Sequence, residues 1–293
     1  MYLGLLLFDL FTNYTQMKTK KIMLYLLIII AIIGLIFLIG KINLANRFSK
    51  EVTQLFAESK NISAKQFTFK QLEGLPEPVE RYFRHVLKDG QPYISYVRLT
   101  HNGQFKTDLK KDWVDITGEQ YFTTEKPGFI WKGITSMFVA RDMYIGNEGR
   151  LIATILSTIN VADIHGKQQY NESELLRWLG ESIWFPTNLL PSERLQWSAI
   201  DSTSAKLTFK YRDLSLFYIV TFNDKNEISE METQRYMDEK RKETWICKAL
   251  KYEEKNGVFI PTHAEVFWRL KEGDFSYARF FVQQIEYDKP EMF

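Results

Sequence analysis

An uncharged apolar run over residues 22–40 constrains this chain more than any other feature of its sequence. It holds 14 Leu, Ile and Phe residues among its 19, and Tyr25 is the one side chain in it that opposes insertion into lipid. As a helix the run is about 28 Å long, which matches the hydrocarbon thickness of a bilayer. Each Leu, Ile or Phe adds roughly −0.3 to −0.6 kcal/mol to insertion. We therefore predict a transmembrane helix here rather than a core helix.

A cleaved signal peptide is the main alternative for this segment. Signal peptides have a shorter apolar region that ends in a small-residue cleavage site. The candidate cut after Ala45 places Asn43, a poor fit, two residues earlier, and no Cys directly follows the run to carry a lipid anchor. The sequence thus favours an uncleaved anchor with a single pass through the cytoplasmic membrane.

The orientation of the span depends on its flanking charges. The basic residues next to the run are Lys18, Lys20 and Lys21 before it and Lys41, Arg47 and Lys50 after it. The positive-inside comparison is close to a tie, but long C-terminal domains cross the membrane largely regardless of charge. The chain has one Cys, so an oxidising compartment costs it nothing. We expect the large C-terminal domain to lie outside the cytoplasm.

Four segments follow from these patterns. Residues 1–21 form a short N-terminal segment. Within it, Met17 is followed by lysines and then by the apolar run, which is the usual order at the start of a membrane-anchored chain. Residues 1–16 are therefore either the product of a start codon assigned too far upstream or a short interfacial segment. Residues 22–40 are the span, 41–74 a helical neck and 75–293 a single β-rich domain. The formal net charge of +2 is too small for the basic surface that nucleic-acid binding needs, so we expect no nucleic-acid partner. The partner that the apolar run predicts is the lipid bilayer.

Three segments carry the helical period. In the neck, Val52, Leu55 and Phe56 share one face. The segment 77–88 has Pro76 and Pro78 at its start, where proline suits a helix, and its Val79, Tyr82, Phe83 and Val86 lie on one side. Residues 172–183 form a third helix, with Asn171 as its expected N-cap and Leu175, Leu176, Leu179 and Ile183 as its apolar stripe.

From residue 91 onward the apolar period changes to two. Apolar and polar residues alternate over 97–105, 205–211, 214–222 and 264–270, with turn sequences such as 126–128 and 146–149 between strands. Crossover helices between these strands are missing, which favours an antiparallel meander. The predicted fold is mainly β, an α+β chain with a curved antiparallel sheet or half-barrel of about ten strands and a few packed helices.

Several segments resemble an uncharacterised family of membrane-anchored bacterial proteins, a domain of unknown function with LPEPVxRYF and WFPTxLLPS motifs. They are LPEPVERYF (75–83), GQPYISYVRLTHNGQF (90–105), QYFTTEKPGFIW (120–131), RDMYIGNEGRL (141–151), WFPTNLLPS (184–192) and FIPTHAEVFW (259–268). The resemblance runs through most of residues 75–287 and implies no established activity. The expected architecture is also similar to the curved half-barrels of bacterial lipoprotein carriers, a likeness of fold alone.

Catalytic and metal-binding signatures are missing: there is no GxSxG, HExxH, P-loop or GxGxxG. We expect Cys247 to be a small buried hydrophobe. Asp163 and His165 are too few for a metal site, so no metal or cofactor is predicted. Arg141 and the next residue, Asp142, form either an internal ion pair or a polar anchor for a head group. The remaining titratable candidates are His85, His101, His263, Glu119, Glu174 and Glu181.

Three functions remain open at this point. The first is a membrane-tethered module that binds a lipid or another apolar ligand, with Trp131, Tyr144, Trp184 and Phe185 as the candidate lining. Trp184 and Phe185 stand in an apolar, Pro-bounded segment that either plugs the concave face of the sheet or borders the mouth of a cavity there. The second is an envelope enzyme using His101, Glu119 or Asp142, and the third is a scaffold that docks another membrane protein.

Overall fold

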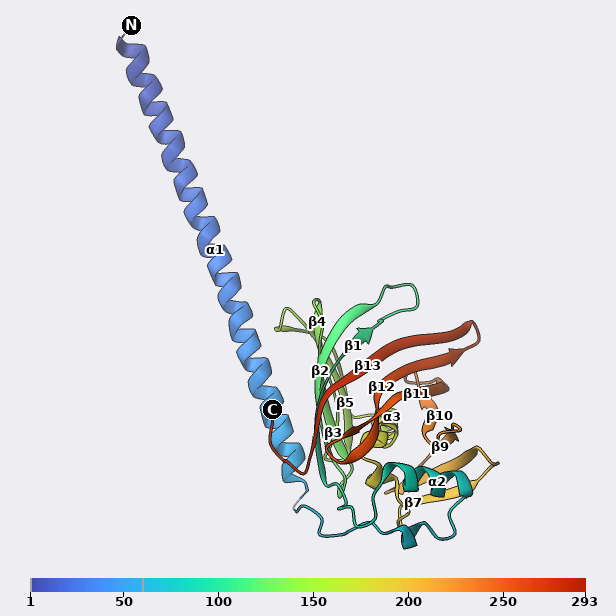
Figure 1. The fold of residues 1–293 in the computed structure, drawn as a ribbon. Helices are drawn as coiled ribbons and strands as arrows, with labels where there is room; N and C mark the ends of the chain where they lie inside the picture. The colour runs from blue at the N-terminus through green and yellow to red at the C-terminus, as the bar shows by residue number, and fades with distance from the viewer. Residues whose placement is uncertain (1, 60) are drawn as a thin grey trace.

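The computed structural model describes the backbone of residues 2–59 and 61–293, and the side chains from residue 18 onward within those ranges. A single helix, α1 (Tyr2–Ala57), runs from Tyr2 to the convex side of a curved sheet (Figure 1). From Lys18 this helix is long and apolar enough to cross a membrane, and none of its apolar stretch is buried in the protein. Helix therefore continues unbroken from the apolar run into the first part of the expected neck.

Thirteen antiparallel strands make one sheet in the described part of the chain. They are β1 (Tyr96–Phe105), β2 (Val114–Thr123), β3 (Gly128–Ile134), β4 (Phe138–Ile145), β5 (Glu148–Ile155), β6 (Ile159–Ile164), β7 (Leu195–Ala199), β8 (Ser204–Tyr211), β9 (Leu214–Phe222), β10 (Ile228–Tyr236), β11 (Lys242–Lys255), β12 (Val258–Leu270) and β13 (Gly273–Tyr287). The predicted mainly-β fold with a curved antiparallel sheet is confirmed. The number of strands exceeds the expected ten because short edge strands such as β6 are largely exposed and show no apolar alternation.

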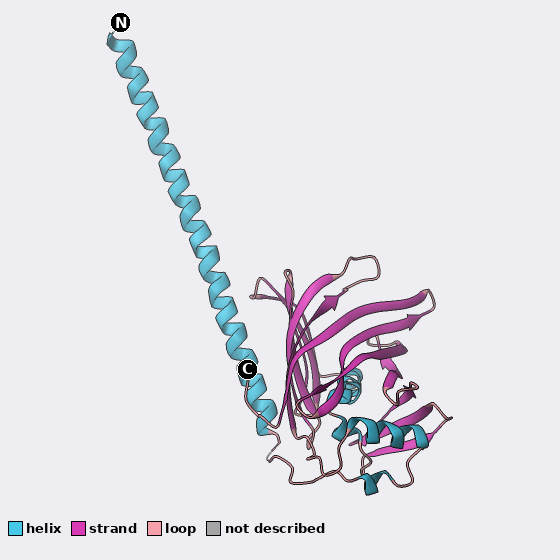
Figure 2. Ribbon diagram, viewed as in Figure 1, coloured by secondary structure: helices cyan, strands magenta, loops and turns pink. Residues whose placement is uncertain are grey.

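The sheet consists of two meanders joined in its middle. Strands β1 to β6 run outward in one direction and β13 back to β7 in the other, with β1 paired to β13. The free edges are β6 and β7, and the chain passes from one to the other through α3 (Gln168–Glu181) and the short helices η2 (Ser182–Trp184) and η3 (Pro186–Leu189). Helix α3 consequently lies inside the curve of the sheet, against β4, β5, β9 and β10 (Figures 1 and 2).

Helix α3 begins four residues before the predicted start and ends two before the predicted end. Its N-cap residue is Lys167, so the expected capping role of Asn171 is wrong. Instead the Asn171 Oδ1 accepts a hydrogen bond from the Gly149 N–H at 2.8 Å, which ties the first turn of the helix to β5. The apolar stripe was placed correctly, because Leu175, Leu176 and Leu179 are buried in the main core.

A second helix closes one end of this core. Helix α2 (Glu77–Val86) follows η1 (Phe69–Leu72), and its predicted apolar face is buried as expected. Tyr82 packs against Phe222 of β9, and Phe83 against Trp197 of β7, with ring centroids 5.7 and 6.3 Å apart. The two prolines at its start have no N–H, so these positions add no unpaired donor to the first turn of the helix.

The convex face carries its own smaller core. Phe48, Val52 and Leu55 of α1 pack against Tyr121, Ile130 and Met143 of β2, β3 and β4. Successive strand residues point to opposite faces, so Tyr121 joins this cluster while its neighbour Phe122 joins the main core. Two of the three residues on the predicted apolar stripe, Val52 and Leu55, are completely buried, and the third, Phe56, packs on the cluster partly buried.

Candidate functional site

A cavity of about 430 Å³ lies between α3 and the concave face of the sheet. Ten aromatic side chains contribute to its wall, with small residues between them. The aromatic lining residues are Phe105, Trp131, Phe138, Tyr170, Trp184, Tyr236, Trp245, Trp268, Tyr277 and Phe280. A cavity of this size, lined mostly by apolar and aromatic groups, is typical of sites that hold a small molecule or part of a larger apolar one.

Small residues in register across the sheet create this space. Ala140 of β4 stands directly opposite Gly133 on one side and Ala153 on the other, and Ala153 stands opposite Ala162 of β6. Ala140 and Ala153 line the cavity. Directly paired residues of an antiparallel sheet share a face, so at the level of this row the concave side of β3–β6 carries no large side chain.

Glycines on the neighbouring strands let two rings lie flat on the sheet. A Cβ at Gly133 would stand 2.3 Å from the Trp131 ring, and one at Gly118 would stand 2.2 Å from the His101 ring. Both distances are far below van der Waals contact, so no other residue type fits beneath these rings. The two rings are joined by a hydrogen bond of 2.8 Å, which the Trp131 Nε1–H donates to the His101 Nε2.

His101 is held neutral in this position. Its side chain is nearly completely buried against Phe280, with ring centroids 4.3 Å apart. Burial lowers its pKa to about 4, and the nearby Arg177 acts in the same direction. As a neutral ring that accepts from Trp131, His101 fixes the orientation of a cavity wall residue, and it is not among the residues that line the cavity itself.

Five buried charged side chains form a cluster on the α3 side of the cavity. Arg177 donates to Asp142 Oδ2 at 2.5 Å and to Glu181 Oε1 at 2.9 Å, and Arg235 donates to Glu174 Oε1 at 3.1 Å. All five line the cavity. Breaking such a buried pair by removing one partner costs about 3–5 kcal/mol, because it leaves a charge without compensation.

The charges in this cluster balance only if one carboxyl keeps its proton. Three carboxyls face two guanidiniums, and Asp142 Oδ1 and Glu174 Oε2 have no hydrogen-bond donor. Burial, and next the charge of Asp142, raise the pKa of Glu174 well above its usual value. A proton on Glu174, shared with Asp142, satisfies both oxygens and makes the cluster neutral.

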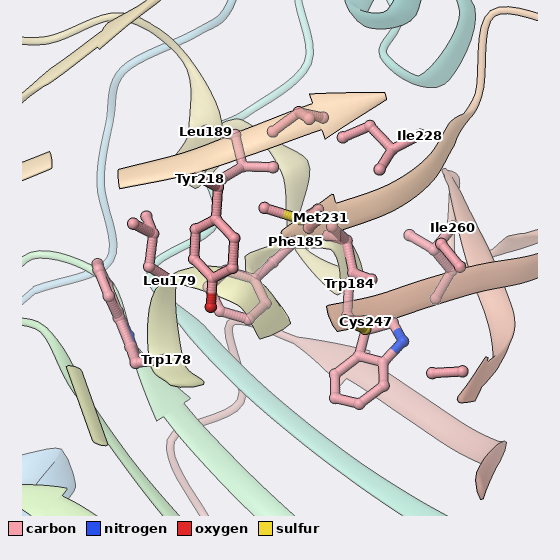
Figure 3. Packing of buried hydrophobic residues seen from close by; sticks show 14 of the residues in the cluster. Trp178, Leu179, Trp184, Phe185, Leu189, Tyr218, Ile228, Met231, Cys247 and Ile260 are labelled. Carbon is pink, nitrogen blue, oxygen red and sulfur yellow. The ribbon is translucent and has the colours of Figure 1, made fainter. Parts of the chain in front are cut away.

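The four aromatic candidates from the sequence separate in the structure. Trp131 and Trp184 line the cavity, whereas Phe185 and Tyr144 do not. Figure 3 shows Trp184 and Phe185 among the packed core residues. The Trp184 Nε1–H donates to the Pro261 carbonyl at 3.1 Å, and Phe185 is fully buried against Phe122. Tyr144 instead lines a small polar hollow near Asn147 and Tyr211.

The titratable candidates also separate. Glu119 is on the convex side, where it pairs with Lys132 and accepts from the Tyr121 hydroxyl. Arg141 and Asp142 do not pair with each other, since adjacent strand residues point to opposite faces. Arg141 pairs with Glu51 of α1 on the convex side and Asp142 with Arg177 on the concave side, so their predicted mutual ion pair is wrong.

The remaining candidates lie apart from one another. Cys247 lines the cavity, and burial raises the pKa of its thiol to about 12. Asp163 pairs with Arg150 on β5, and among the described residues no group of three His, Cys, Asp or Glu side chains could hold a metal ion. His85 stacks edge-on against Phe259, and His263 packs on Phe281.

Sequence reasoning missed Arg177 and Arg235 as site residues. A signal for Arg177 was present, because Glu174, Arg177 and Glu181 follow the i, i+3, i+7 spacing of one helix face. Such a charged stripe opposite an apolar one is normally the solvated side of a helix. Here residues 173–180 are buried all round, because the sheet curls past both sides of α3.

Comparison with known proteins gives one family and several distant structural likenesses. Residues 65–280 match a family of unknown function (DUF6544). None of the curated proteins compared with the chain matches it. A domain described as an outer membrane lipoprotein-sorting protein from Vibrio parahaemolyticus is 9% identical, with a TM-score of 0.40 over 74% of this chain and 93% of its own. A LolA superfamily protein from Nitrosomonas europaea is 12% identical, with a TM-score of 0.38 over 73% and 94%. A DUF1329 family protein from Desulfovibrio piger is 8% identical, with a TM-score of 0.39 over 82% and 93%.

Proposed function

Because this chain belongs to a family of unknown function (DUF6544), its activity has to come from its own cavity, and we propose that it is a membrane-tethered domain that binds a lipid or another apolar ligand. The observation that carries the proposal is the cavity of about 430 Å³ between α3 and the sheet, with its aromatic wall and its row of small residues. Burial of apolar ligand surface against such a wall contributes roughly 25 cal/mol per Å².

The ligand contacts that we propose are Trp131 and Trp184. Trp131 is fixed by its hydrogen bond to His101 and by the Arg177 guanidinium 5.0 Å from its ring centroid. Trp184 is fixed by its hydrogen bond to Pro261. Rigid aromatic rings lose little conformational entropy when a ligand arrives, which favours binding. Phe185 and Tyr144, which do not line the cavity, are not among the proposed contacts.

Binding has more support than catalysis in this cavity. Each carboxyl of the buried charged cluster already has an arginine donor, and Glu181 accepts from the Gln120 side-chain amide as well as from Arg177. His101 is engaged with Trp131 and Glu119 is on the other face of the sheet. The groups proposed for an enzyme therefore do not converge on one reacting position.

The tether in this proposal is the apolar part of α1. Its residues 22–40 cross the cytoplasmic membrane once and are not cleaved off. The short segment 1–21 precedes it, the neck 41–74 joins it to the domain 75–293, and that domain faces away from the cytoplasm. After carbonate washing, full-length protein should stay in the membrane pellet. Release of a soluble form starting near Asn46 would contradict the tether, and a reporter after Phe293 that is active only in the cytoplasm would contradict the orientation.

The binding experiment uses the detergent-extracted full chain and mass spectrometry of the lipids that co-purify with it. Replacing both Ala140 and Ala153 with Leu places two large side chains in the cavity and should remove most of the retained lipid. The matched control is Ala162→Leu, because Ala162 continues the same row on β6 and does not line the cavity. Equal lipid retention by the filled variant and the control would contradict the proposal.

A further inference from the structure

The turn between β5 and β6 meets α1 where the apolar run ends. A Cβ added to Gly40, the last residue of that run, would stand 2.4 Å from Thr158 Cγ2 and 2.8 Å from the Ser157 carbonyl oxygen. The glycine therefore lets the turn touch the helix backbone. Farther along, Glu58 just after the helix accepts from the Gly146 N–H at 3.1 Å, at the opposite end of β5. Helix α1 thus runs the length of the convex face and leaves the sheet beside this turn (Figure 1).

Exposed apolar side chains gather at this end of the sheet. Leu156 in the turn is 64% exposed, and Ile159 and Val161 of β6 are 52% and 58% exposed. Met137, 58% exposed, lies in the adjacent β3–β4 connection, because Phe138 at the start of β4 pairs with Ile155 at the end of β5. Such a group of large exposed apolar side chains on an edge strand and the adjacent turns marks an interaction surface.

A groove of about 230 Å³ lies between the helix and the β5–β6 hairpin, next to the contact at Gly40. Its helix side changes along α1 from Ile36 and Ile39, within the apolar run, to Arg47 about 16 Å beyond Ile36. Its sheet side adds Arg141 and the hydroxyl groups of Thr154 and other polar residues of the hairpin. Two guanidiniums line the groove and Glu51, which pairs with Arg141, compensates one of them.

We propose that the β5–β6 turn rests on the bilayer beside the span and that the groove behind it holds the phosphate head group of a membrane phospholipid. The order of groups along the groove matches the order within a lipid leaflet: apolar side chains at the acyl level, then arginines and hydroxyls at the phosphate level. Hydrogen bonds between a guanidinium and a phosphate are among the strongest in proteins. At the membrane surface, Arg side chains are attracted to the anionic head groups of lipids. This inference rests on the proposed tether and is independent of any ligand in the cavity.

The contact would also bring part of the cavity wall close to the membrane. Phe105 and Phe138 line the cavity and stand at the same end of the sheet as the β5–β6 turn. The proposed interface site therefore lies at the same end of the sheet as this part of the cavity wall.

The first experiment measures depth with an environment-sensitive fluorophore on full-length protein in nanodiscs. We attach the fluorophore to Leu156→Cys, and as control to Ile200→Cys, which is 50% exposed and follows β7 at the far edge of the sheet. Lipids carrying a quencher near the head group should quench the Leu156 position at least several-fold more than the Ile200 position. Equal quenching at the two positions would overturn the inference.

The second experiment measures lipid retention by native mass spectrometry in mixed phosphatidylglycerol and phosphatidylcholine nanodiscs. Arg47→Gln should lower the retained phosphatidylglycerol several-fold, whereas Lys50→Gln, on the same helix and outside the groove, should not. An unchanged lipid pattern in Arg47→Gln would overturn the head-group site. Release of the wild-type chain from membranes by carbonate defeats the tether and this inference together. A pelleted chain with equal quenching at the two positions defeats this inference alone.

Discussion

The two faces of the sheet are covered by helices in different ways. On the convex side α1 packs Phe48, Val52 and Leu55 directly onto the strands, and the contact is apolar throughout its centre. On the concave side α3 leaves a cavity and presents buried charges to it. The same curved sheet thus has one face specialised for a firm helix contact and one that borders a cavity. The difference arises because the curvature spreads apart the side chains of the convex face and lets one helix press close, while small residues hold the concave face open.

The largest effect should come from breaking the buried charge cluster. Arg177→Met leaves Asp142 and Glu181 without their arginine and should lower the free energy of unfolding by about 3–5 kcal/mol. Thermal unfolding of the detergent-solubilised chain, followed by tryptophan fluorescence, measures this. The matched control is Arg150→Met, because its pair with Asp163 is largely exposed and should be worth only about 0–1 kcal/mol. Equal losses in the two variants would show that the concave charges are no more structural than surface pairs.

On the convex face, Leu55→Ala should cost roughly 2–5 kcal/mol through the lost apolar burial and the space it leaves. Leu250→Ala is the control, since that leucine is 46% exposed and its loss should change stability by less than about 0.5 kcal/mol. The same unfolding assay applies. A small loss at Leu55 would mean that α1 only leans on the sheet and that the two faces differ less than the packing indicates.

The next effect in size is the pH dependence of stability, which we expect to come from the buried carboxyl Glu174 on the concave side. The raised pKa of Glu174 means that the folded protein favours its protonated form, so this residue stabilises the fold most at low pH. That contribution is lost progressively as the pH rises above the unfolded value of about 4.5 and through the folded pKa. The Glu174→Gln variant cannot ionise at this position. Between pH 5 and pH 9 its free energy of unfolding should therefore fall less than that of wild type, and the difference should be about the cost of ionising Glu174 in the folded protein. Denaturant titrations across that range measure the free energy of unfolding of both proteins. If the two stabilities change with pH in the same way, the proton shared between Glu174 and Asp142 is contradicted.

The smallest expected change is at Cys247. Its thiol pKa, raised by burial to about 12, keeps it protonated, so alkylation by iodoacetamide at about pH 8 should be negligible in the native chain and complete in denaturant. Reaction in the native state would mean that the concave wall opens, in contrast to the convex contact. Loss of that reaction on adding a co-purified lipid would place the ligand beside Cys247.

Local patterns in the sequence were enough for much of the architecture. The helix predicted over 77–88, which ends at Val86 in the structure, and the apolar stripe of Leu175, Leu176 and Leu179 follow from the 3.6-residue period, and the antiparallel sheet follows from the period of two. The boundaries of α3 were shifted because Asn171 has a tertiary partner, Gly149, in place of a capping role. The extra strands were missed because exposed edge strands bury no face and so carry no alternation.

By itself, the sequence determined the long apolar helix, the antiparallel sheet and the apolar faces of the smaller helices, since each is a periodic property of neighbouring residues. Only the tertiary structure decided that Trp131 and Trp184 share a cavity while Phe185 and Tyr144 do not line it. It also decided that Arg177 and Arg235, from a helix and a distant strand, meet three carboxyls in the interior. Those groupings depend on how β6 and β7 are bridged by α3 across the concave face, and on the curvature of thirteen strands together. No local period encodes that curvature, because it is a sum over pairings between residues far apart in the chain.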